Sequence, residues 1–376
     1  MDKNAVELFE SLGVRPIVNA AGPISQYGGG RSRPEVIEAV ATAFRVPVQI
    51  HELNRRAGET IAEMIGVEAA FVSSGAAGGL VLQAAACIAG TDEDKMKRLP
   101  DSTGMNNEII IQTCQRFGYD QSYLVGGGRI VNAGESEGCS PEQLEEAFTD
   151  RTAAAAYLFA AHASRNAVPF DRFCEIAHSR GVPVVVDAAN FLPPRSNMRR
   201  FMDEGADMVA FSGGKAVRGP QGAGILLGRT EFIEAARANG SPNNFVARSM
   251  KVSKEEIVGL ITAIKVFLNE DEEAETARYT EMCRQAVDAL VEIPGVTVSL
   301  EHDGRDYLIP TAVVRFNEDW RGPTQAEILS ALSRGDPPVF VRTLGGPGEI
   351  GIDPINLDEE TLDIVIRRVR EALLSK

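Results

Sequence analysis

The chain has 376 residues, 44% of them hydrophobic, and its 53 acidic side chains outnumber 38 basic ones, which gives a net charge of −15. That length suits two domains of about 150 residues each, and the composition predicts an ordered globular protein. The negative charge and the lack of a long lysine or arginine run argue against a nucleic-acid partner. No apolar run approaches the roughly 18 residues of a membrane span, and the N-terminus lacks a signal-peptide pattern, so we expect a cytoplasmic protein. The five cysteines are scattered, so we expect neither a disulfide framework nor a metal site.

The first two thirds of the chain alternate between expected strands and expected helices. Short, mostly apolar runs predict strands at residues 68–73, 108–113, 129–134, 153–160, 182–189, 207–212 and 223–228. Helices are expected at about 32–44, 54–65, 76–89, from 140 onward and at 171–180. Apolar strands separated by helices predict a parallel sheet covered on both faces, with ligands at the carboxyl ends of the strands.

Residue types at the helix ends support these boundaries. Ser32 and Glu35 have the spacing of a capping box, and Ser140 is followed by Gln143 at the same spacing. Gly66 is expected to end the second helix, because glycine adopts the left-handed conformation that closes many helices.

A change in composition near Ser253 predicts a second domain. One or two long helices are expected first, with the acidic run at 269–275 as a solvated helix face or a break between helices. Strand-like runs and two helices follow, which predicts a small α+β domain. We therefore expect an N-terminal segment (1–45) that contributes to the active site or a dimer contact, a large domain (46–252) and a small C-terminal domain (253–376).

The segment FSGGKAVRGPQGAGILLG at 211–228 places Lys215 in a glycine-rich turn between two expected strands. The glycines indicate that something approaches the backbone closely at this turn. A pyridoxal-phosphate enzyme would hold its Schiff-base lysine in such a place. The alternative interpretation is an ordinary solvated loop lysine.

The segment FVSSGAAGG at 71–79 reads as a strand followed by small residues that open a helix. The first turn of a helix offers unpaired backbone N–H groups and a positive dipole, which together favour a phosphate. The amides of Gly75, Ala76 and Ala77 and the hydroxyl of Ser74 can surround such a group, and Ser212 can add a second hydroxyl. An ordinary tight turn is the alternative.

The apolar run VPVVVDAAN ends on a carboxylate, Asp187, which is costly at the end of a buried strand without a partner. A carboxylate beside a pyridine nitrogen keeps that nitrogen protonated, which is the form that withdraws electrons best. Asp187 precedes Lys215 by 28 residues, or one helix and one strand, so both are expected at the ends of nearby strands. A capping aspartate is the alternative.

In this order, the serine-glycine turn, an HxS loop with His162 and Ser164, the strand ending in Asp187 and the SGGK segment followed by GPQ resemble fold-type-I pyridoxal-phosphate enzymes. More narrowly, the chain is similar to the selenocysteine synthase (L-seryl-tRNA selenium transferase) group and to relatives of the D-glucosaminate-6-phosphate ammonia lyase type. The matching segments lie at 14–22, 52–80, 181–194, 205–229, 248–257, 337–344 and 348–354.

The resemblance implies a large domain with a mostly parallel sheet, a small C-terminal α+β domain and pyridoxal 5'-phosphate as the cofactor. It implies Lys215 as the Schiff-base residue and Asp187 as the partner of the ring nitrogen. Ser74, Gly75, Ala76, Ala77 and Ser212 fall at the phosphate, and Asn190 joins the cofactor-binding set. The resemblance also implies a homodimer or a larger homo-oligomer, with each active site at a dimer interface.

Arg342 matches the position expected to grip a substrate carboxylate, which the planar guanidinium meets in two parallel bonds. A surface arginine is the alternative. His162 is expected to touch the ring or the substrate, or else to be structural. Gln112 departs from the pattern, because several relatives carry a histidine near this point, and Gln112 and Cys114 are both candidates to cover the ring. Substrate selection is expected from residues that include Tyr27 and His51.

The preferred reaction is an elimination on a hydroxylated amino acid or an amino sugar acid, such as D-glucosaminate or its 6-phosphate. Lys215 would remove the α-proton as a general base, and loss of the hydroxyl group would lead to a 2-oxo acid and ammonia. Racemisation, retro-aldol cleavage and transfer of the selenium transferase type begin with the same groups and remain alternatives. A non-catalytic protein that only binds the cofactor is an alternative of a different class.

Overall fold

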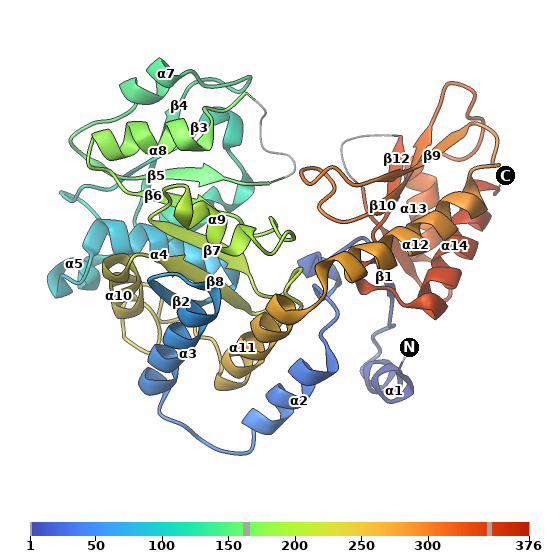
Figure 1. The fold of residues 1–376 in the computed structure, drawn as a ribbon, viewed down its shortest axis with the longest axis horizontal. Helices are drawn as coiled ribbons and strands as arrows, with labels where there is room; N and C mark the ends of the chain where they lie inside the picture. The colour runs from blue at the N-terminus through green and yellow to red at the C-terminus, as the bar shows by residue number, and fades with distance from the viewer. Residues whose placement is uncertain (1, 161–165, 344–347, 376) are drawn as a thin grey trace. The chain divides into compact units, whose positions relative to one another are not determined.

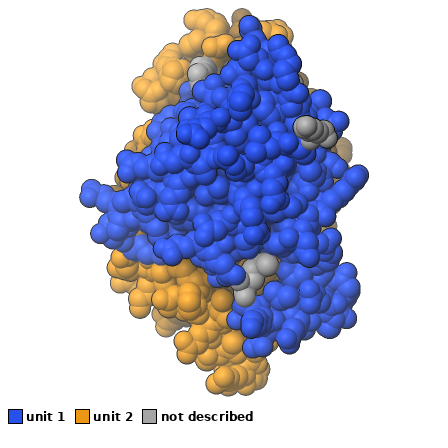
Figure 2. Space-filling model, turned by 90° about the vertical axis from the view of Figure 1, so that its right-hand side faces the viewer, with its two compact units in different colours: residues 1–31, 270–376 blue, residues 32–269 orange. Residues whose placement is uncertain are grey.

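The computed structural model describes residues 2–160, 166–343 and 348–375 of the chain (Figure 1). The chain divides into two compact units, which Figure 2 colours separately: unit 1 comprises residues 1–31 and 270–376, and unit 2 comprises residues 32–269. These boundaries differ from the expected ones at 46 and 253. Helix α11 (Lys254–Asn269) packs on α2 (Pro34–Ala43), so both belong to unit 2. Strand β1 (Val18–Ala20) pairs with β11 (Val339–Val341), so the N-terminal segment belongs to unit 1.

Unit 2 is built on a seven-stranded sheet with the order β2-β8-β7-β6-β5-β3-β4. The strands are β2 (Ala69–Ser74), β3 (Glu108–Gln112), β4 (Arg129–Ala133), β5 (Thr152–Leu158), β6 (Val184–Asp187), β7 (Met208–Ser212) and β8 (Ala223–Gly228). Pairs from β7 to β4 are parallel, and β8 is antiparallel to both β7 and β2. The sheet is thus mostly parallel, as expected. Strand β8 is the exception because residues 213–222 are too short for the crossover of a dozen or more residues that a parallel pair needs.

The helices of unit 2 connect and cover these strands. Besides α2 and α11 they are α3 (Ile50–Ile65), α4 (Gly75–Ala89), α5 (Glu93–Arg98), α6 (Gln121–Val125), α7 (Pro141–Glu146), α8 (Phe170–Ser179), α9 (Asn197–Asp203) and α10 (Thr230–Asn239). The capping box of Ser140 and Gln143 at α7 is confirmed, as is the left-handed Gly66 that ends α3. The capping box expected at Ser32 is wrong. Arg33 is the N-cap residue of α2 and makes no side-chain cap bond, because Pro34 occupies the first helical position with its φ already set.

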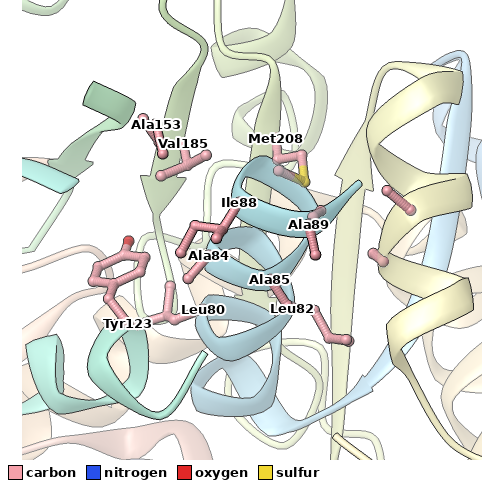
Figure 3. Packing of buried hydrophobic residues seen from close by; sticks show 14 of the residues in the cluster. Leu80, Leu82, Ala84, Ala85, Ile88, Ala89, Tyr123, Ala153, Val185 and Met208 are labelled. Carbon is pink, nitrogen blue, oxygen red and sulfur yellow. The ribbon is translucent and has the colours of Figure 1, made fainter. Parts of the chain in front are cut away.

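Both faces of the sheet are covered. On one face Leu80, Ala84 and Ile88 of α4 pack in a cluster that includes Val185 of β6 and Met208 of β7 (Figure 3). Side chains alternate along a strand, so neighbours of these residues point to the other face. There, aromatic rings gather between the strands and the helices α8 and α9, with contacts Tyr157–Phe173, Phe159–Phe201 and Phe201–Phe211. The expectation of a sheet between two helical layers is confirmed.

Unit 1 contains a three-stranded antiparallel sheet in the order β12-β10-β9 and the parallel pair of β1 with β11. Its remaining elements are β9 (Val296–Glu301), β10 (Thr311–Phe316), β12 (Glu349–Ile352), α1 (Lys3–Ser11), α12 (Glu272–Leu290), α13 (Gln325–Ser333) and α14 (Glu359–Leu373). The acidic run expected as a helix face or break forms a break, with Asp271 as the N-cap of α12. Across the described part of the chain, no helix has the length and apolar character needed to cross a membrane.

Candidate active site

Four of the residues singled out from sequence end strands of the large sheet. Ser74, Gln112, Asp187 and Ser212 are the last residues of β2, β3, β6 and β7. Strand β2 is antiparallel to β8, and β8 is antiparallel to β7, so β2 points in the same direction as the parallel set. All four residues therefore lie along one edge of the sheet, which is the edge where open α/β sheets bind ligands.

Lys215 lies in the turn between β7 and β8, three residues after Ser212. The Gly213 N–H donates to the Ala223 carbonyl at 2.9 Å, which closes the turn onto the start of β8. A Cβ atom at Gly213 would lie 2.7 Å from the Ala223 oxygen, and one at Gly214 would lie 2.5 Å from the Gln221 Cα. The close approach inferred from the glycines is thus an approach of the chain's own returning backbone.

Lys215 and Asp187 influence each other's charge. Burial lowers the pKa of the Lys215 ammonium, and the carboxylate of Asp187 opposes this shift. Burial raises the pKa of Asp187, while the Ala189 N–H, 3.0 Å from its Oδ1, and the charge of Lys215 favour the ionised carboxylate. A solvated loop lysine would lack this environment. The structure places an amine of lowered basicity near a carboxylate that gains from a neighbouring positive charge.

The turn that opens α4 has the features of an anion site. Ser74 is the N-cap residue, but its side chain makes no capping bond to the first turn. Ala76 and Ala77 lie in that first turn, where backbone N–H groups lack partners inside the helix. The Gly75 amide was expected at the phosphate. Its N–H instead donates to the Gly222 carbonyl at 2.9 Å.

Ser212 lies across β8 from Ser74. In the register of the sheet Ser74 is opposite Ala223 and Ser212 is opposite Gly224, on the two sides of β8. Two strand spacings separate them, so their backbones are about 10 Å apart. Because Ala223 and Gly224 are consecutive, this register directs the two side chains to opposite faces of the sheet, and what they share is the edge where the strands end. The first-turn amides of α4, the Lys215 amine and the Asp187 carboxylate are groups of the kinds that the phosphate, the aldehyde and the ring nitrogen of pyridoxal phosphate require.

The two candidates for covering a cofactor ring differ in their surroundings. Gln112 is fully buried, its Oε1 accepts the Val168 N–H at 2.7 Å, and its Nε2 donates to the Gln115 Oε1 at 3.4 Å. These bonds hold the amide inside the protein. Cys114 is only partly buried in the short turn after β3 and stays a candidate to cover the ring.

Three further candidates lie in different parts of the described chain, and a fourth lies outside it. Asn190 is exposed, three residues beyond Asp187, and His51 is exposed in the first turn of α3. His162 lies outside the described residues. Tyr27 belongs to unit 1, where its ring packs against Phe340 at a centroid distance of 4.5 Å.

Arg342 lies in unit 1 and is not a surface arginine. Its side chain is 15% exposed, its Nη1 lies 3.7 Å from the Asp353 Oδ2, and its Nη2 donates to the Asp306 carbonyl at 3.2 Å. The guanidinium lies over the ring of Tyr307, 5.7 Å from the centroid. Burial raises the pKa of Asp353, and the charge of Arg342 opposes that shift. The arginine is therefore held in place from several sides.

Sequence reasoning missed Asp353 and the glycine beside it. Gly22 has a φ of +91°, and a Cβ atom there would lie 2.6 Å from the Asp353 Oδ2. The backbone N–H of Asp353 also donates to the Ala20 carbonyl at 2.9 Å. The available signal was an acidic residue at the end of an apolar strand, the same signal that pointed to Asp187.

Comparisons with known proteins match nearly the whole chain. A model of the family described as aminotransferase class-V matches residues 42–318. The 5'-C-glycyluridine monooxygenase-decarboxylase of a Streptomyces species is 33% identical over 374 residues, which cover 97% of this chain and 92% of that enzyme. The D-glucosaminate-6-phosphate ammonia lyase of Salmonella typhimurium is 30% identical over 370 residues, which cover 97% of each protein.

Structural and more distant matches agree with these. A solved structure of D-glucosaminate-6-phosphate ammonia-lyase has a TM-score of 0.85 and 29% identity, and the match covers 97% of this chain and 98% of that one. The L-seryl-tRNA(Sec) selenium transferase of Alkaliphilus metalliredigens is 22% identical, over 77% of this chain and 64% of that enzyme. The resemblance inferred from the motifs is confirmed. So is the fold, a mostly parallel sheet with a small α+β unit.

Proposed function

This chain belongs to the aminotransferase class-V family, whose enzymes use pyridoxal 5'-phosphate, and from that premise we propose that it is an ammonia lyase. The proposed substrate is a hydroxylated amino acid or an amino sugar acid, such as D-glucosaminate or its 6-phosphate. The observation that carries this proposal is the half-buried pair of Lys215 and Asp187, which lies at the sheet edge where α4 begins. The 30% identity to D-glucosaminate-6-phosphate ammonia lyase supports the substrate class.

The proposed reaction removes the α-proton and the hydroxyl group of the neighbouring carbon, which leave together as water. The enamine that results takes up one water and releases ammonia, which leaves a 2-oxo acid. The bound pyridoxal phosphate supplies an electron sink that stabilises negative charge on the α-carbon.

Lys215 is the proposed base. Because burial lowers the pKa of its ammonium, more of the neutral amine is present near neutral pH than for a solvated lysine. The Asp187 carboxylate is proposed to hold a proton on the ring nitrogen. A positive charge at that nitrogen would favour ionised Asp187 in the same way as the charge of Lys215 does.

Binding and orientation are assigned to the remaining groups. The hydroxyls of Ser74 and Ser212 and the first-turn amides of Ala76 and Ala77 are proposed to hold the phosphate. Arg342 is proposed to bind the substrate carboxylate, and the contacts with Asp353 and Tyr307 support this role because they pre-orient the guanidinium.

A decarboxylation that consumes oxygen is the second candidate. The specific observation in its favour is the 33% identity to a monooxygenase-decarboxylase, which covers as much of this chain as the match to the ammonia lyase. The two reactions break different bonds to the α-carbon. One releases ammonia and keeps the carboxyl group, whereas the other releases carbon dioxide.

The cofactor proposal is tested with purified protein saturated with pyridoxal phosphate. We expect a visible absorbance band that borohydride reduction abolishes, with the reduced cofactor attached to the peptide that contains Lys215. Lys215→Ala should lose the band, whereas Lys97→Ala, which removes an exposed lysine paired with Glu93, should keep it. A wild-type protein without the band would refute the proposal.

The reaction is tested by incubating the holoenzyme with 3-hydroxy amino acids, D-glucosaminate and its 6-phosphate. Ammonia and 2-oxo acid should form in equal amounts with no oxygen uptake. Carbon dioxide with oxygen uptake on an amino acid carrying a nucleoside would instead favour the second candidate, and racemisation without ammonia would exclude both.

We also propose a homodimer or larger homo-oligomer. Large apolar side chains are exposed on one segment of unit 2, with Ile37 at 59%, Phe44 at 68% and Val46 at 57% exposure. Apolar side chains gathered in this way are typical of protein contacts. Light scattering should give a mass of at least twice the 40.4 kDa of the chain, and a monomer at micromolar concentration would contradict this.

A further inference from the structure

One polar side chain of α4 connects three elements of unit 2. Gln83 is 0% exposed, and its Nε2 donates to the Val186 carbonyl of β6 at 3.0 Å. Its Oε1 accepts a hydrogen bond from the Tyr123 hydroxyl of α6 at 3.3 Å. Tyr123 is itself 3% exposed. The amide therefore uses a donor and an acceptor to join α6, α4 and β6 in the interior.

The surroundings of Gln83 do not need a polar group for packing. Leu80 and Cys87, three residues before and four residues after Gln83, flank it on α4, and both pack in or against the buried cluster, in which Figure 3 shows Leu80 and Tyr123. A methionine would fill almost the same volume. Burying an amide costs free energy unless its bonds are made, so the retained glutamine indicates that the bonds themselves matter.

Both ends of the cofactor site are attached to these elements. Helix α4 begins at Gly75, eight residues before Gln83, which is roughly 12 Å along the helix. On β6 the bonded carbonyl belongs to Val186, directly before Asp187. The side chain of Asp187 points to the same face of the sheet as Val185, which packs on α4. The charge of Asp187 also raises the pKa of Tyr123, which burial raises first, so the phenol lies near that carboxylate.

We propose that Gln83 is a positioning residue that sets the spacing between the phosphate turn and Asp187. The inference rests on the proposed function, because it takes the α4 turn and Asp187 as the sites for the phosphate and the ring nitrogen. Helix α4 is rigid, so a hydrogen bond from its middle to β6 fixes the distance between the turn at its start and Asp187. These two groups are proposed to bind the phosphate and the ring nitrogen, which are opposite ends of one rigid cofactor. Tyr123 holds the amide in the orientation in which Nε2 faces Val186.

Three variants of the full chain test this. Gln83→Met keeps the volume and removes both bonds, and Tyr123→Phe removes only the hydroxyl. The matched control is Asn239→Leu. Asn239 is also 0% exposed, and its Nδ2 donates to the carbonyl of Gly90, the residue that ends α4 away from the site. All three are titrated with pyridoxal phosphate, with the visible band as the signal, and unfolded with urea.

Gln83→Met should bind pyridoxal phosphate at least tenfold more weakly than the wild type, and Tyr123→Phe about threefold more weakly. Asn239→Leu should lose stability but bind the cofactor within twofold of the wild type. The visible band of bound pyridoxal phosphate is expected to change with pH. In Gln83→Met the midpoint of this change should lie at a lower pH than in the wild type, because a displaced Asp187 stabilises the protonated form of the bound cofactor less. A purely structural role would not move this spectroscopic value.

Equal loss of cofactor affinity in Gln83→Met and Asn239→Leu, with no change in the pH of the band, would overturn the inference. If Gln83→Met does not fold, wild-type affinity in a folded Tyr123→Phe would overturn it. A wild-type protein that never shows the band would refute the proposed function and this inference with it. Normal binding by the wild type with unaffected variants would refute the inference alone.

Discussion

The backbone N–H of Gly75 donates to the carbonyl of Gly222 at 2.9 Å, which ties the turn that opens α4 to the residue before β8. Gly224, two residues after Gly222, packs against the same turn. A Cβ atom there would be 2.3 Å from the carbonyl carbon and oxygen of Gly75. The turn proposed to hold the phosphate and the start of β8 are therefore packed backbone against backbone, with no room for a side chain.

Gly224→Ala should displace the α4 turn and weaken cofactor binding. The methyl group cannot be accommodated by a side-chain rotation, because its neighbours are backbone atoms, so we expect a stability loss of about 1–3 kcal/mol. Gly118→Ala is the matched control, since its Cβ would have no atom within 4 Å and its φ is not positive. Urea unfolding and cofactor titration measure both effects. A Gly224→Ala protein with wild-type affinity would exclude this turn from the phosphate site.

The pH dependence of cofactor attachment should follow the lowered pKa of Lys215. Only the neutral amine attacks an aldehyde, so the rate of cofactor attachment should rise with pH to a plateau. The midpoint of this rise should lie below the ordinary lysine pKa of about 10.4. Asp187 raises the pKa of Lys215, so Asp187→Asn should move the midpoint to lower pH even though it weakens binding. Stopped-flow absorbance between pH 6 and 11 gives both midpoints. A wild-type midpoint at or above the ordinary value would contradict the burial of the amine.

Arg342→Met should impair substrate binding and also destabilise the protein. The Michaelis constant should rise about tenfold or more because a charge-assisted bond to the substrate carboxylate is lost. The buried carboxylate of Asp353 would lose its partner, at a cost of about 3 kcal/mol. Adding Asp353→Asn should recover much of the stability but not the Michaelis constant. Recovery of both by the double variant would show that Arg342 has only a structural role.

The stability of Arg342→Met should fall more steeply than that of the wild type as the pH rises. Burial raises the folded-state pKa of Asp353 above the unfolded value of about 3.9, and loss of Arg342 removes a group that opposes this. A carboxyl group with a raised pKa contributes stability that is complete below the unfolded pKa and is lost as the pH rises through the folded pKa. Arg342→Met should therefore lose more stability than the wild type between pH 4 and 7 in urea titrations. Parallel pH profiles would contradict the coupling.

Cys114 should be protected by the cofactor if it lies beside the ring. It is partly buried, whereas Cys139 is buried and burial raises the pKa of its thiol to about 11. Iodoacetamide should therefore modify Cys114 in protein without cofactor, with Cys139 as the unreactive internal control. Saturation with pyridoxal phosphate should slow the modification of Cys114, as measured by peptide mass spectrometry. An unchanged rate would remove Cys114 from the ring site.

Local patterns in the sequence predicted the elements that carry the site. The run predicted at 207–212 ends at the same residue as β7, and the run predicted at 182–189 contains β6, which ends two residues earlier, because apolar stretches bounded by polar or glycine residues define buried strands. Asp187 and Lys215 were found for the same reason, since a charge after such a strand is conspicuous. The capping box at Ser140 was found because it needs only neighbouring residues.

Features that depend on distant contacts could not be read in this way. The ion pair of Arg342 with Asp353 depends on how β12 turns beside β11, and the bonds of Gln112 depend on Val168. Unit 2 ends at Asn269 and not near the expected boundary at 253, because α11 packs on α2, more than 200 residues earlier in the chain. At Ser32 the pattern was present, but Pro34 fixed the start of the helix one residue later.

The reversed direction of β8 has a consequence for the order in which the site assembles. Strands β7 and β8 are neighbours in sequence and form a hairpin around Lys215, so their pairing closes only a short loop. Strand β2 joins the other side of β8 from far away in the chain, with Ser74 opposite Ala223. Short loops close at a lower entropic cost than long ones, so the lysine loop can form first and the turn of α4 can dock onto it later. Pulse-labelling hydrogen exchange during refolding should show β7 and β8 amides protected before those of β2, and the lysine would then be in place before the anion site exists.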